Sequence, residues 1–222
     1  MSPINRNLLG LRVNTRLAGY AALAGAALAA PAVADAAIIY SGPVVINIPS
    51  TTSGIYINVV TGLAGTNAGT PGWDINPWNT SALEFFTPSP GPAGAGEMVG
   101  TGGTYFNLTL GTLISAASTF ADAGTTAINP GTPLNFSSSN NIMGFRFINE
   151  AAGNVVEYGW VRISLSATAG GQPRAVVEYA YENDPQFGIL AGAVPEPSTI
   201  ALLGVMAAGA LGVRAWRKGK AT

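Results

Sequence analysis

Short runs of β-branched and aromatic residues alternate with turn residues through the middle of the chain. The runs at residues 38–40, 44–48, 55–60, 83–86 and 105–110 are separated by segments rich in Gly, Pro, Asn, Ser and Thr. Such runs are typical of short strands, and the residues between them are typical of turns. The pattern therefore predicts a mostly β fold, with an antiparallel β-sandwich or jelly-roll-like domain.

The clearest alternation lies in the last third of this region. Three runs, at residues 143–149, 155–167 and 174–182, are joined by segments that contain Gly, Asn and Pro. Consecutive antiparallel strands with short connections form a β-meander. We therefore predict that these three runs are neighbouring strands of one sheet.

The alternation also predicts how the last two strands of the meander pair. Their odd-numbered residues are apolar at 161–165 and at 177–181. Because side chains alternate between the two faces, joining the apolar faces requires odd-numbered residues opposite odd-numbered ones. A hairpin centred on Gly170 satisfies this condition and places Arg162 opposite Glu178. We expect the odd-numbered face to lie in the core.

The even-numbered residues of these strands are more polar. The same hairpin places Tyr158 opposite Glu182, and we expect this second face to be at least partly solvated. The residues predicted on it are Arg146, Tyr158, Trp160, Arg162, Glu178 and Glu182.

Two other segments lack a strand pattern. Residues 88–103 are rich in Pro and Gly and predict a long loop, which is unusual in a compact domain. Residues 113–123 predict either a short helix or irregular structure.

The N-terminal segment has the features of an export signal. Arg6, Arg12 and Arg16 accompany an Ala- and Leu-rich run at 17–30, and small residues follow at 32–36. This order of charge, apolar run and small residues predicts a signal peptide over residues 1–36, with a signal helix in the apolar run. An uncleaved membrane anchor is the alternative.

The C-terminal segment has the length and composition of one membrane span. Residues 198–213 carry no charge, and Ala215 and Trp216 extend the apolar stretch past Arg214. We therefore predict a transmembrane helix at about 198–216 in the lipid bilayer. Arg214, Arg217 and Lys218 follow as a basic stop, which predicts a cytoplasmic C-terminus. A buried core helix is the alternative. The exported domain would then comprise residues 37–192.

Pro195, Glu196 and Pro197 precede this span. The Pro-Glu-Pro motif, the apolar helix and the basic tail together resemble the PEP-CTERM sorting signal over residues 193–220. The resemblance implies an exported substrate of exosortase, a membrane processing enzyme, in a Gram-negative bacterium that makes extracellular polysaccharide. It implies anchoring in the inner membrane before processing and the cell surface or extracellular matrix afterwards. A single-span protein that is never processed is the alternative.

Composition narrows the chemistry of the predicted domain. The chain contains no Cys and no His, which excludes thiol nucleophiles, Ser-His triads and the common zinc sites. Residues 37–192 carry three arginines against nine carboxylates, so we expect no nucleic acid partner. We expect no catalytic residue, no metal and no cofactor, and hence a protein that is not an enzyme.

Carboxylates are the remaining catalytic candidates, and they define a hydrolase alternative. Glu178 and Glu182 are four residues apart on one strand, about 13 Å at ~3.3 Å per residue, which is too far for a glycosidase pair. A cross-strand pair of Glu157 with Glu182 stays open. A salt-bridged polar face with the arginines is the interpretation we favour.

One loop contains the residues of a carbohydrate-binding alternative. Trp73 and Trp78 flank Asp74, and exposed Trp rings beside polar groups can stack on sugar rings, which would make extracellular polysaccharide a partner. Packing of both rings against the core is the competing interpretation. Asp74, Asn76 and Asn79 could bind calcium, but a single carboxylate supplies too little charge for a convincing site.

Overall fold

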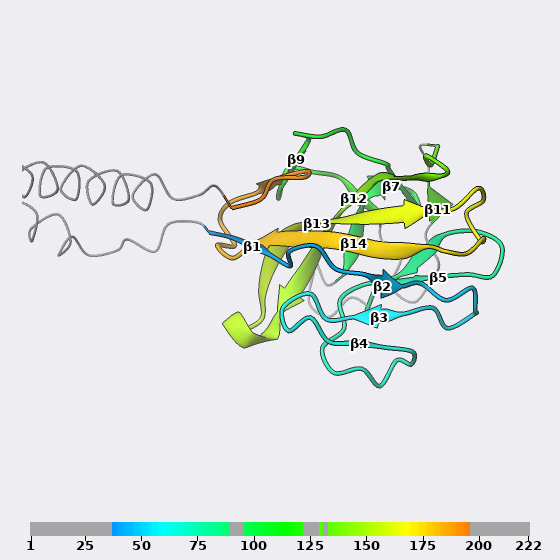
Figure 1. Cartoon of the computed structure of the whole chain (residues 1–222). Coiled ribbons are helices and arrows are strands. Elements are labelled where there is room, and N and C mark those ends of the chain that lie inside the picture. The colour runs from blue at the N-terminus through cyan, green and yellow to red at the C-terminus, as the bar shows by residue number, and fades with distance from the viewer. Residues whose placement is uncertain (1–36, 89–95, 122–128, 131–132, 196–222) are drawn as a thin grey trace, which may run out of the picture. The chain divides into compact units, whose positions relative to one another are not determined.

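The computed structural model describes residues 37–88, 96–121, 129–130 and 133–195 (Figure 1). The chain divides into two units, residues 1–35 and 36–222, and every described residue belongs to the second. The described residues form strands and one 3-10 turn, η1 (Glu150–Ala152), with no α-helix among them. No helix in these residues has the length and apolar character needed to cross a membrane. The predicted signal helix and the predicted span at 198–216 lie outside the described residues.

The largest element is a nine-stranded sheet, the main sheet, in the order β1-β14-β13-β12-β7-β8-β11. β2 also pairs with β14, and β10 also pairs with β7. All pairs are antiparallel except β11 with β8, so the mostly β, antiparallel prediction is confirmed. The strands are β1 (Ile38–Tyr40), β2 (Ile46–Asn47), β7 (Glu97–Thr101), β8 (Thr104–Tyr105), β10 (Phe120–Ala121), β11 (Asn129–Pro130), β12 (Ser138–Asn149), β13 (Val155–Leu165) and β14 (Ala175–Glu182).

β12, β13 and β14 form the predicted meander at the centre of this sheet. Arg162 lies opposite Glu178 and Tyr158 lies opposite Glu182, which confirms the predicted register. A β-bulge then shifts the pairing, so that Ile163 lies opposite Val176. Val176 is fully buried, whereas Val177 is only half-buried. The expectation that Val177 belongs to the core face is therefore wrong, because the bulge reverses the alternation at this point.

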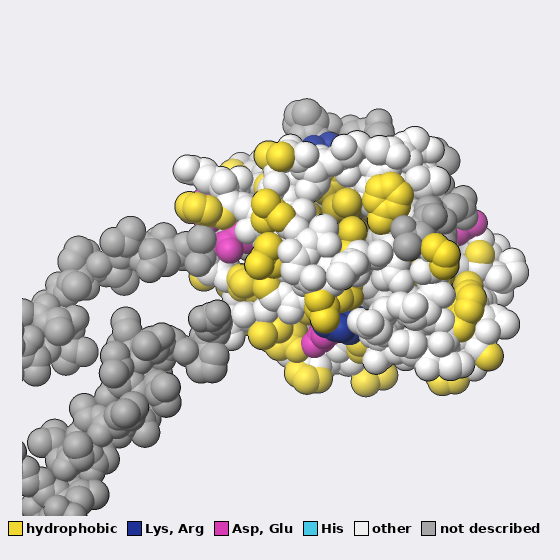
Figure 2. Space-filling view, turned by 90° about the horizontal axis from the view of Figure 1, so that it is seen from above, with side chains coloured by type: hydrophobic (Ala, Val, Ile, Leu, Met, Phe, Trp, Pro, Cys, Tyr) yellow, Lys and Arg dark blue, Asp and Glu magenta, His cyan; other side chains and the backbone are white. Residues whose placement is uncertain are grey.

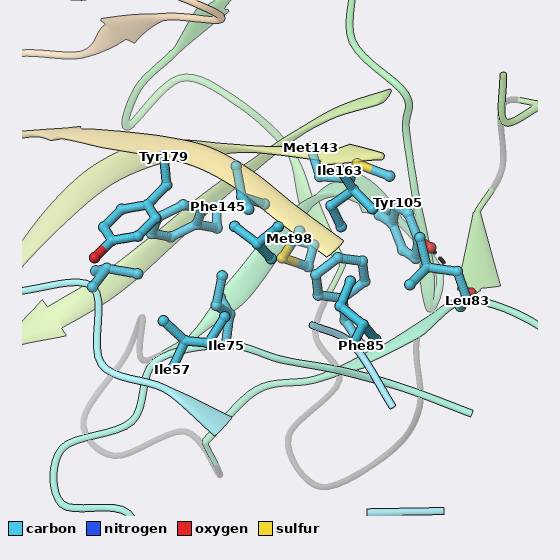
Figure 3. Close-up of a cluster of buried hydrophobic side chains, with 14 of the residues drawn as sticks. Ile57, Ile75, Leu83, Phe85, Met98, Tyr105, Met143, Phe145, Ile163 and Tyr179 are labelled. Carbon is cyan, nitrogen blue, oxygen red and sulfur yellow. Dashed lines mark hydrogen bonds between the residues drawn. The ribbon is translucent and has the colours of Figure 1, made fainter. Parts of the chain in front are cut away.

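One face of the main sheet packs against two short hairpins, and the main hydrophobic core lies between them (Figure 3). The hairpins are β3 (Tyr56–Ile57) with β4 (Ala64–Gly65), and β5 (Asn76–Trp78) with β6 (Glu84–Phe86). Their apolar side chains meet those of β7, β12, β13 and β14. Among the residues that share this core are Ile57, Ile75, Leu83, Phe85, Met98, Tyr105, Met143, Phe145, Ile163 and Tyr179.

The second face of the main sheet is covered by a separate two-stranded sheet, β9 (Leu113–Ile114) with β15 (Ile189–Leu190). A second hydrophobic cluster fills this contact, and Trp160 and Ala180 in it are fully buried. Three of the six residues predicted on this face are buried, namely Tyr158, Trp160 and Glu182, and the other three, Arg146, Arg162 and Glu178, are partly exposed, as expected of a partly solvated face. The chain after β14 returns across this face, and the strand alternation alone does not reveal that return.

Only part of the second face retains contact with solvent. Arg162 forms an ion pair with Glu178, and each side chain is 20% exposed. The hydroxyl of Tyr40 donates a hydrogen bond to the same carboxylate. By contrast, Glu182 is buried. The salt-bridged polar face is thus confirmed for Arg162 and Glu178.

Three segments differ from their predicted structure. In the described part of the segment 113–123, up to Ala121, β9 and β10 form with irregular structure between them, and the helix alternative is wrong there. Residues 88–103 contain β7 and so are not one long loop, and β5 forms where the sequence analysis predicted no strand. These strands are short or contain Gly or Pro, so their stability comes from pairing with distant segments, which local patterns do not encode.

A buried arginine joins the end of the meander to the hairpin layer. The side chain of Arg174 is only 1% exposed, and burial lowers the pKa of its guanidinium. Its N–H groups donate to backbone carbonyl oxygens and to no carboxylate in the described residues. The acceptors are Ile48 (3.1 Å), Pro49 (2.9 Å), Ala82 (2.6 Å), Ala169 (2.7 Å) and Asn79.

Candidate functional site

The fold holds the chain up to Ala193. The indole N–H of Trp160, a fully buried residue of β13, donates a hydrogen bond of 3.0 Å to the carbonyl oxygen of Ala193. The amide of Ala193 donates in turn to the carbonyl oxygen of Leu190, at 2.9 Å. Both backbone polar groups of Ala193 are therefore bonded to the folded domain.

The residues before Ala193 are fixed by pairing with the segment around β9. Leu190 lies opposite Leu113, and the amide of Ala191 donates to the carbonyl oxygen of Thr112, at 2.8 Å. Gly192 has a φ of +80°, and a Cβ at this position would lie 2.3 Å from Cδ2 of Leu110. Glycine is thus favoured by the backbone conformation, and any larger residue would also displace the exposed end of Leu110.

Beyond Ala193 the chain becomes accessible. Val194 is 43% exposed, and Pro195, the first residue of the predicted sorting motif, is also exposed. Glu196, Pro197 and the basic residues Arg214, Arg217 and Lys218 lie outside the described residues. The structure therefore describes the approach to the predicted motif rather than the motif itself.

The first and last described residues lie close together. Ala37 and Ile38 line a pocket of about 510 Å³ together with Val194 and Pro195. The remaining lining residues belong to the segment 188–193. Ala37 would be the first residue after removal of a signal peptide over residues 1–36. It therefore lies beside Val194 and Pro195, where the sorting motif begins.

Trp73 and Trp78 both pack against other aromatic rings. Trp73 meets Tyr56 edge-on, with ring centroids 4.9 Å apart, and Trp78 stacks on Phe86 at 4.7 Å with the rings 7° from parallel. Both Trp side chains are half-buried, and the indole nitrogen of Trp78 is buried without a hydrogen-bond partner. The two rings thus extend the core at its edge.

Asp74 is buried rather than open to a ligand. It is 3% exposed, and its carboxylate accepts a hydrogen bond of 2.8 Å from the amide of Val59. Burial raises the pKa of Asp74 to about 8, the hydrogen bond from Val59 opposes this rise, and the charges of Glu150 and Glu157 add to it. The carboxyl group is therefore largely neutral at pH 7. Within the described ranges, no group of three or more Asp, Glu, His or Cys residues could hold a metal ion.

Glu157 and Glu182 point to opposite faces of the main sheet. Glu157 lies opposite Phe147 and follows the odd-numbered core face, whereas Glu182 lies opposite Tyr158 on the other face. These two carboxylates cannot flank one substrate bond. Glu157 is fully buried, accepts a hydrogen bond of 3.0 Å from Asn149, and has a pKa raised by burial.

A pocket that the sequence did not predict lies between three loops. It has a volume of about 800 Å³ and is lined by Asn58, Val60–Leu63, Pro71, Gly72 and Asn149–Ala151. The two Asn side chains in it are already hydrogen-bonded to backbone groups. Asn58 donates to the carbonyl oxygen of Pro71, and Asn149 accepts from the amide of Ala152. The pocket therefore offers few groups with which to bind a polar ligand.

A family model described as the PEP-CTERM protein-sorting motif matches residues 193–219. No curated protein and no solved structure matches the chain. The match begins at Ala193, the residue that Trp160 holds, and includes the Pro-Glu-Pro sequence and the basic cluster. The chain therefore carries a PEP-CTERM protein-sorting motif, which marks it as an exported protein targeted to exosortase.

Proposed function

We propose that the segment 193–220 is a temporary membrane anchor that exosortase removes, and that residues 37–192 form a non-enzymatic protein of the cell surface or extracellular matrix. Before processing, a transmembrane helix at about 198–216 holds the chain in the inner membrane of a Gram-negative bacterium. The basic residues Arg214, Arg217 and Lys218 lie on the cytoplasmic side. After processing, the domain is released outward.

The observation that carries this proposal is the coincidence of two boundaries. Within the described residues, the last backbone bonds to the fold are those of Ala193, and the matched motif begins at the same residue. A processing enzyme needs backbone that no sheet protects, and Val194 and Pro195 are exposed. Pro195 and Pro197 restrict the backbone around Glu196 to extended conformations. Pro195, the described residue of the motif, is thus accessible directly after the folded domain.

The fold supports a β-sandwich as the architecture of the released domain. The main sheet is covered on one face by the β3–β4 and β5–β6 hairpins and on the other by β9–β15. The main sheet and the hairpin layer face each other across one core, as the two sheets of a sandwich do, and β9–β15 adds a cover over the other face. Such a domain needs neither disulfides nor a metal to bury a core of this size.

A structural rather than enzymatic role is supported by the state of the carboxylates. Asp74 and Glu157 are buried, and Glu182 lies on the opposite face of the sheet from Glu157. Glu178 is engaged by Arg162 and Tyr40. These carboxylates are buried or bonded to other residues of the fold. The chain has no His or Cys that could act as acid, base or nucleophile in their place.

The proposal is tested by altering the motif in cells that contain exosortase. A chain with a C-terminal epitope tag and an internal tag is expressed as wild type, as Glu196→Ala, and as Pro195→Ala with Pro197→Ala. We expect the wild type to lose the C-terminal tag and the variants to retain it. Pro185→Ala, which alters another exposed proline ten residues before the motif, is the control and should be processed like the wild type. Equal processing of all four chains would contradict the proposal.

A further inference from the structure

The exposed apolar side chains of the domain gather where the chain leaves for the sorting motif. Nine large hydrophobic side chains are exposed in the described residues, and five of them lie in two short segments, 110–113 and 187–194. These five form what we call the exit patch: Leu110, Leu113, Phe187, Leu190 and Val194. Their exposed fractions lie between 43% and 58%.

The members of the exit patch are neighbours in space. Leu113 and Leu190 are directly opposite each other in the β9–β15 pair. Leu110 packs beside Gly192, and Leu113 packs beside Gly188, the residue after Phe187. Figure 2 shows the face over which β9 lies, with many hydrophobic side chains at its surface and few charged ones. Leu110, Leu113 and Leu190 therefore lie around the exit, and Phe187 and Val194 belong to the same short segment as Leu190.

Charge is absent from the segments that build the patch. Residues 108–119 and 185–195 contain no Asp, Glu, Lys or Arg. The nearest acid along the chain is Asp184, whose carboxylate accepts a hydrogen bond from the amide of Gln186. In space, the guanidinium of Arg162 lies beside Gly192, and it is paired with Glu178. The patch side chains themselves are apolar and the adjacent pair has no net charge, so we expect a partner recognised by apolar contact.

The length of chain between the patch and the predicted span identifies that partner. Up to Pro195, where the described chain stops, Ala193 is the last residue with both backbone groups bonded to the fold, and the span is predicted to begin at Ser198. Five residues reach at most about 18 Å when fully extended. The polar headgroup layer alone is about 5–8 Å thick. While the anchor is in the membrane, the patch cannot move far from the lipid surface.

We infer that the exit patch rests on the lipid surface of the bilayer that holds the chain's own anchor. This inference depends on the proposed anchoring and adds a second contact to it. Leucine and phenylalanine side chains partition into the boundary between headgroups and acyl chains, as they do on interfacial helices. The contact orients the domain and holds the Pro-Glu-Pro motif at a fixed height above the membrane until the anchor is removed.

The inference can be tested with single fluorescent labels, because the chain has no native cysteine. Leu113→Cys and Leu190→Cys are labelled with an environment-sensitive fluorophore, and the full chain is placed in phosphatidylcholine nanodiscs at one chain per disc. Val45→Cys is the matched control. Val45 is 87% exposed and lies next to β2, which pairs with the Ala175 end of β14. The chain start at β1 pairs with the opposite, Glu182 end. Val45 therefore tests an exposed apolar position away from the exit.

We expect the labels at positions 113 and 190 to shift their emission to the blue and to be quenched by spin-labelled lipids, and the label at position 45 to show neither effect. Raising the salt concentration should leave the quenching unchanged. Because all three side chains are exposed, the labelled variants should unfold at the wild-type temperature, which confirms that they fold.

The outcomes separate this inference from the anchoring on which it rests. Co-elution of the chain with the discs reports the anchor by itself. Co-elution without quenching at 113 and 190 overturns the patch contact and leaves the anchor standing, and failure to co-elute overturns both. Quenching that appears only when exosortase is added to the disc overturns the lipid contact in favour of a protein contact. The one-chain loading excludes a second copy as the occupant.

Discussion

Trp160 and Ala193 are 33 residues apart, and the indole N–H of the first donates to the carbonyl oxygen of the second at 3.0 Å. The bond joins the buried centre of the main sheet to the residue at which the sorting motif begins. It defines where the rigid domain ends and where accessible backbone begins. Together with the β9–β15 pairing and the backbone bonds of Ala191 and Ala193, this bond fixes the chain directly before the motif.

Replacing Trp160 with Phe should loosen this end of the domain. The variant keeps an aromatic ring in the second cluster but leaves the carbonyl of Ala193 without its donor, at a cost of about 1 kcal/mol. Hydrogen exchange measured by NMR should then show amide exchange at Ala191 and Ala193 faster by roughly fivefold.

Trp78→Phe is the control for this change, because the indole nitrogen of Trp78 has no hydrogen-bond partner. It should leave exchange at Ala191 and Ala193 unaltered. Equal effects from the two variants would show that ring volume, rather than the hydrogen bond, secures the exit.

Replacing Arg174 with Met should destabilise the domain severely. The change removes the donor shared by five backbone carbonyl oxygens in three separate loops and leaves buried acceptors unsatisfied, so we expect a loss of at least about 3 kcal/mol. Arg174→Lys should restore only part of this loss, because an ammonium group lacks the planar fork of donors. Urea unfolding measures both changes.

The comparison for Arg174 is Arg162→Lys. Arg162 belongs to a partly exposed ion pair, so its replacement should cost less than about 1 kcal/mol. A loss at Arg174 no larger than the loss at Arg162 would contradict the role assigned to the buried arginine.

The stability of the domain should fall as the pH rises from about 4 to about 8. Burial raises the pKa of Asp74 to about 8, so the folded chain keeps this proton while the unfolded carboxyl loses it near pH 4. The stabilisation that comes from the protonated Asp74 is fully present below the pKa of this residue in the unfolded chain. It is fully lost above its pKa in the folded chain. Thermal unfolding across this range should show the decline.

Asp74→Asn should flatten this profile, because an amide keeps the acceptor for Val59 and has no proton to lose. Glu157→Gln should flatten it further, since burial raises the pKa of Glu157 in the same direction. A wild-type profile that rises between pH 5 and pH 8, or an unchanged slope in Asp74→Asn, would contradict the buried neutral state.

Trp78→Ala should act on stability rather than on carbohydrate binding. The ring stacks on Phe86 and is half-buried, so its removal should cost about 2 kcal/mol, below the range for fully buried Trp. On a glycan array we expect no sugar-specific signal for the wild type, and none for Trp73→Ala. A wild-type signal that Trp73→Ala abolishes, with unfolding unchanged, would establish the carbohydrate-binding alternative.

The sequence predicted the meander because its signal is local. Two long strands with a short connection align their apolar faces in few ways, and this condition alone placed Arg162 opposite Glu178. It failed one residue later at Val177, because a bulge depends on packing with neighbouring strands such as the segment around Val44, whose amide bonds to the carbonyl oxygen of Val177.

The covering of the second face could not be read from the strands themselves. Tyr158 and Trp160 share their face with Arg162, Glu178 and Glu182, and charged residues are usual on a solvated face. The two-residue strands β9 and β15 bury them, and pairs so short and so distant in sequence leave no periodic signal. The burial of Asp74 could not be predicted for the same reason, because its carboxylate is held by the amide of Val59, 15 residues away.

The sorting motif was predictable because its three parts follow one another along the chain. Its relation to the fold was not, because the bond from Trp160 to Ala193 links residues that no local pattern connects. The exit patch belongs to the same class of features: Leu113 and Leu190 are unremarkable in the sequence and become a surface only when β9 and β15 pair.

The central claim is most directly tested by the intact mass of the protein recovered from outside the cell. Mass spectrometry compares cells with and without exosortase. With the enzyme, we predict a chain that begins near residue 35 or 37 and ends close to the Pro-Glu-Pro motif, without the apolar segment and the basic cluster. Without the enzyme, the full C-terminus should stay in the membrane fraction. The same C-terminus in both strains, with residues 199–220 retained, would contradict the account.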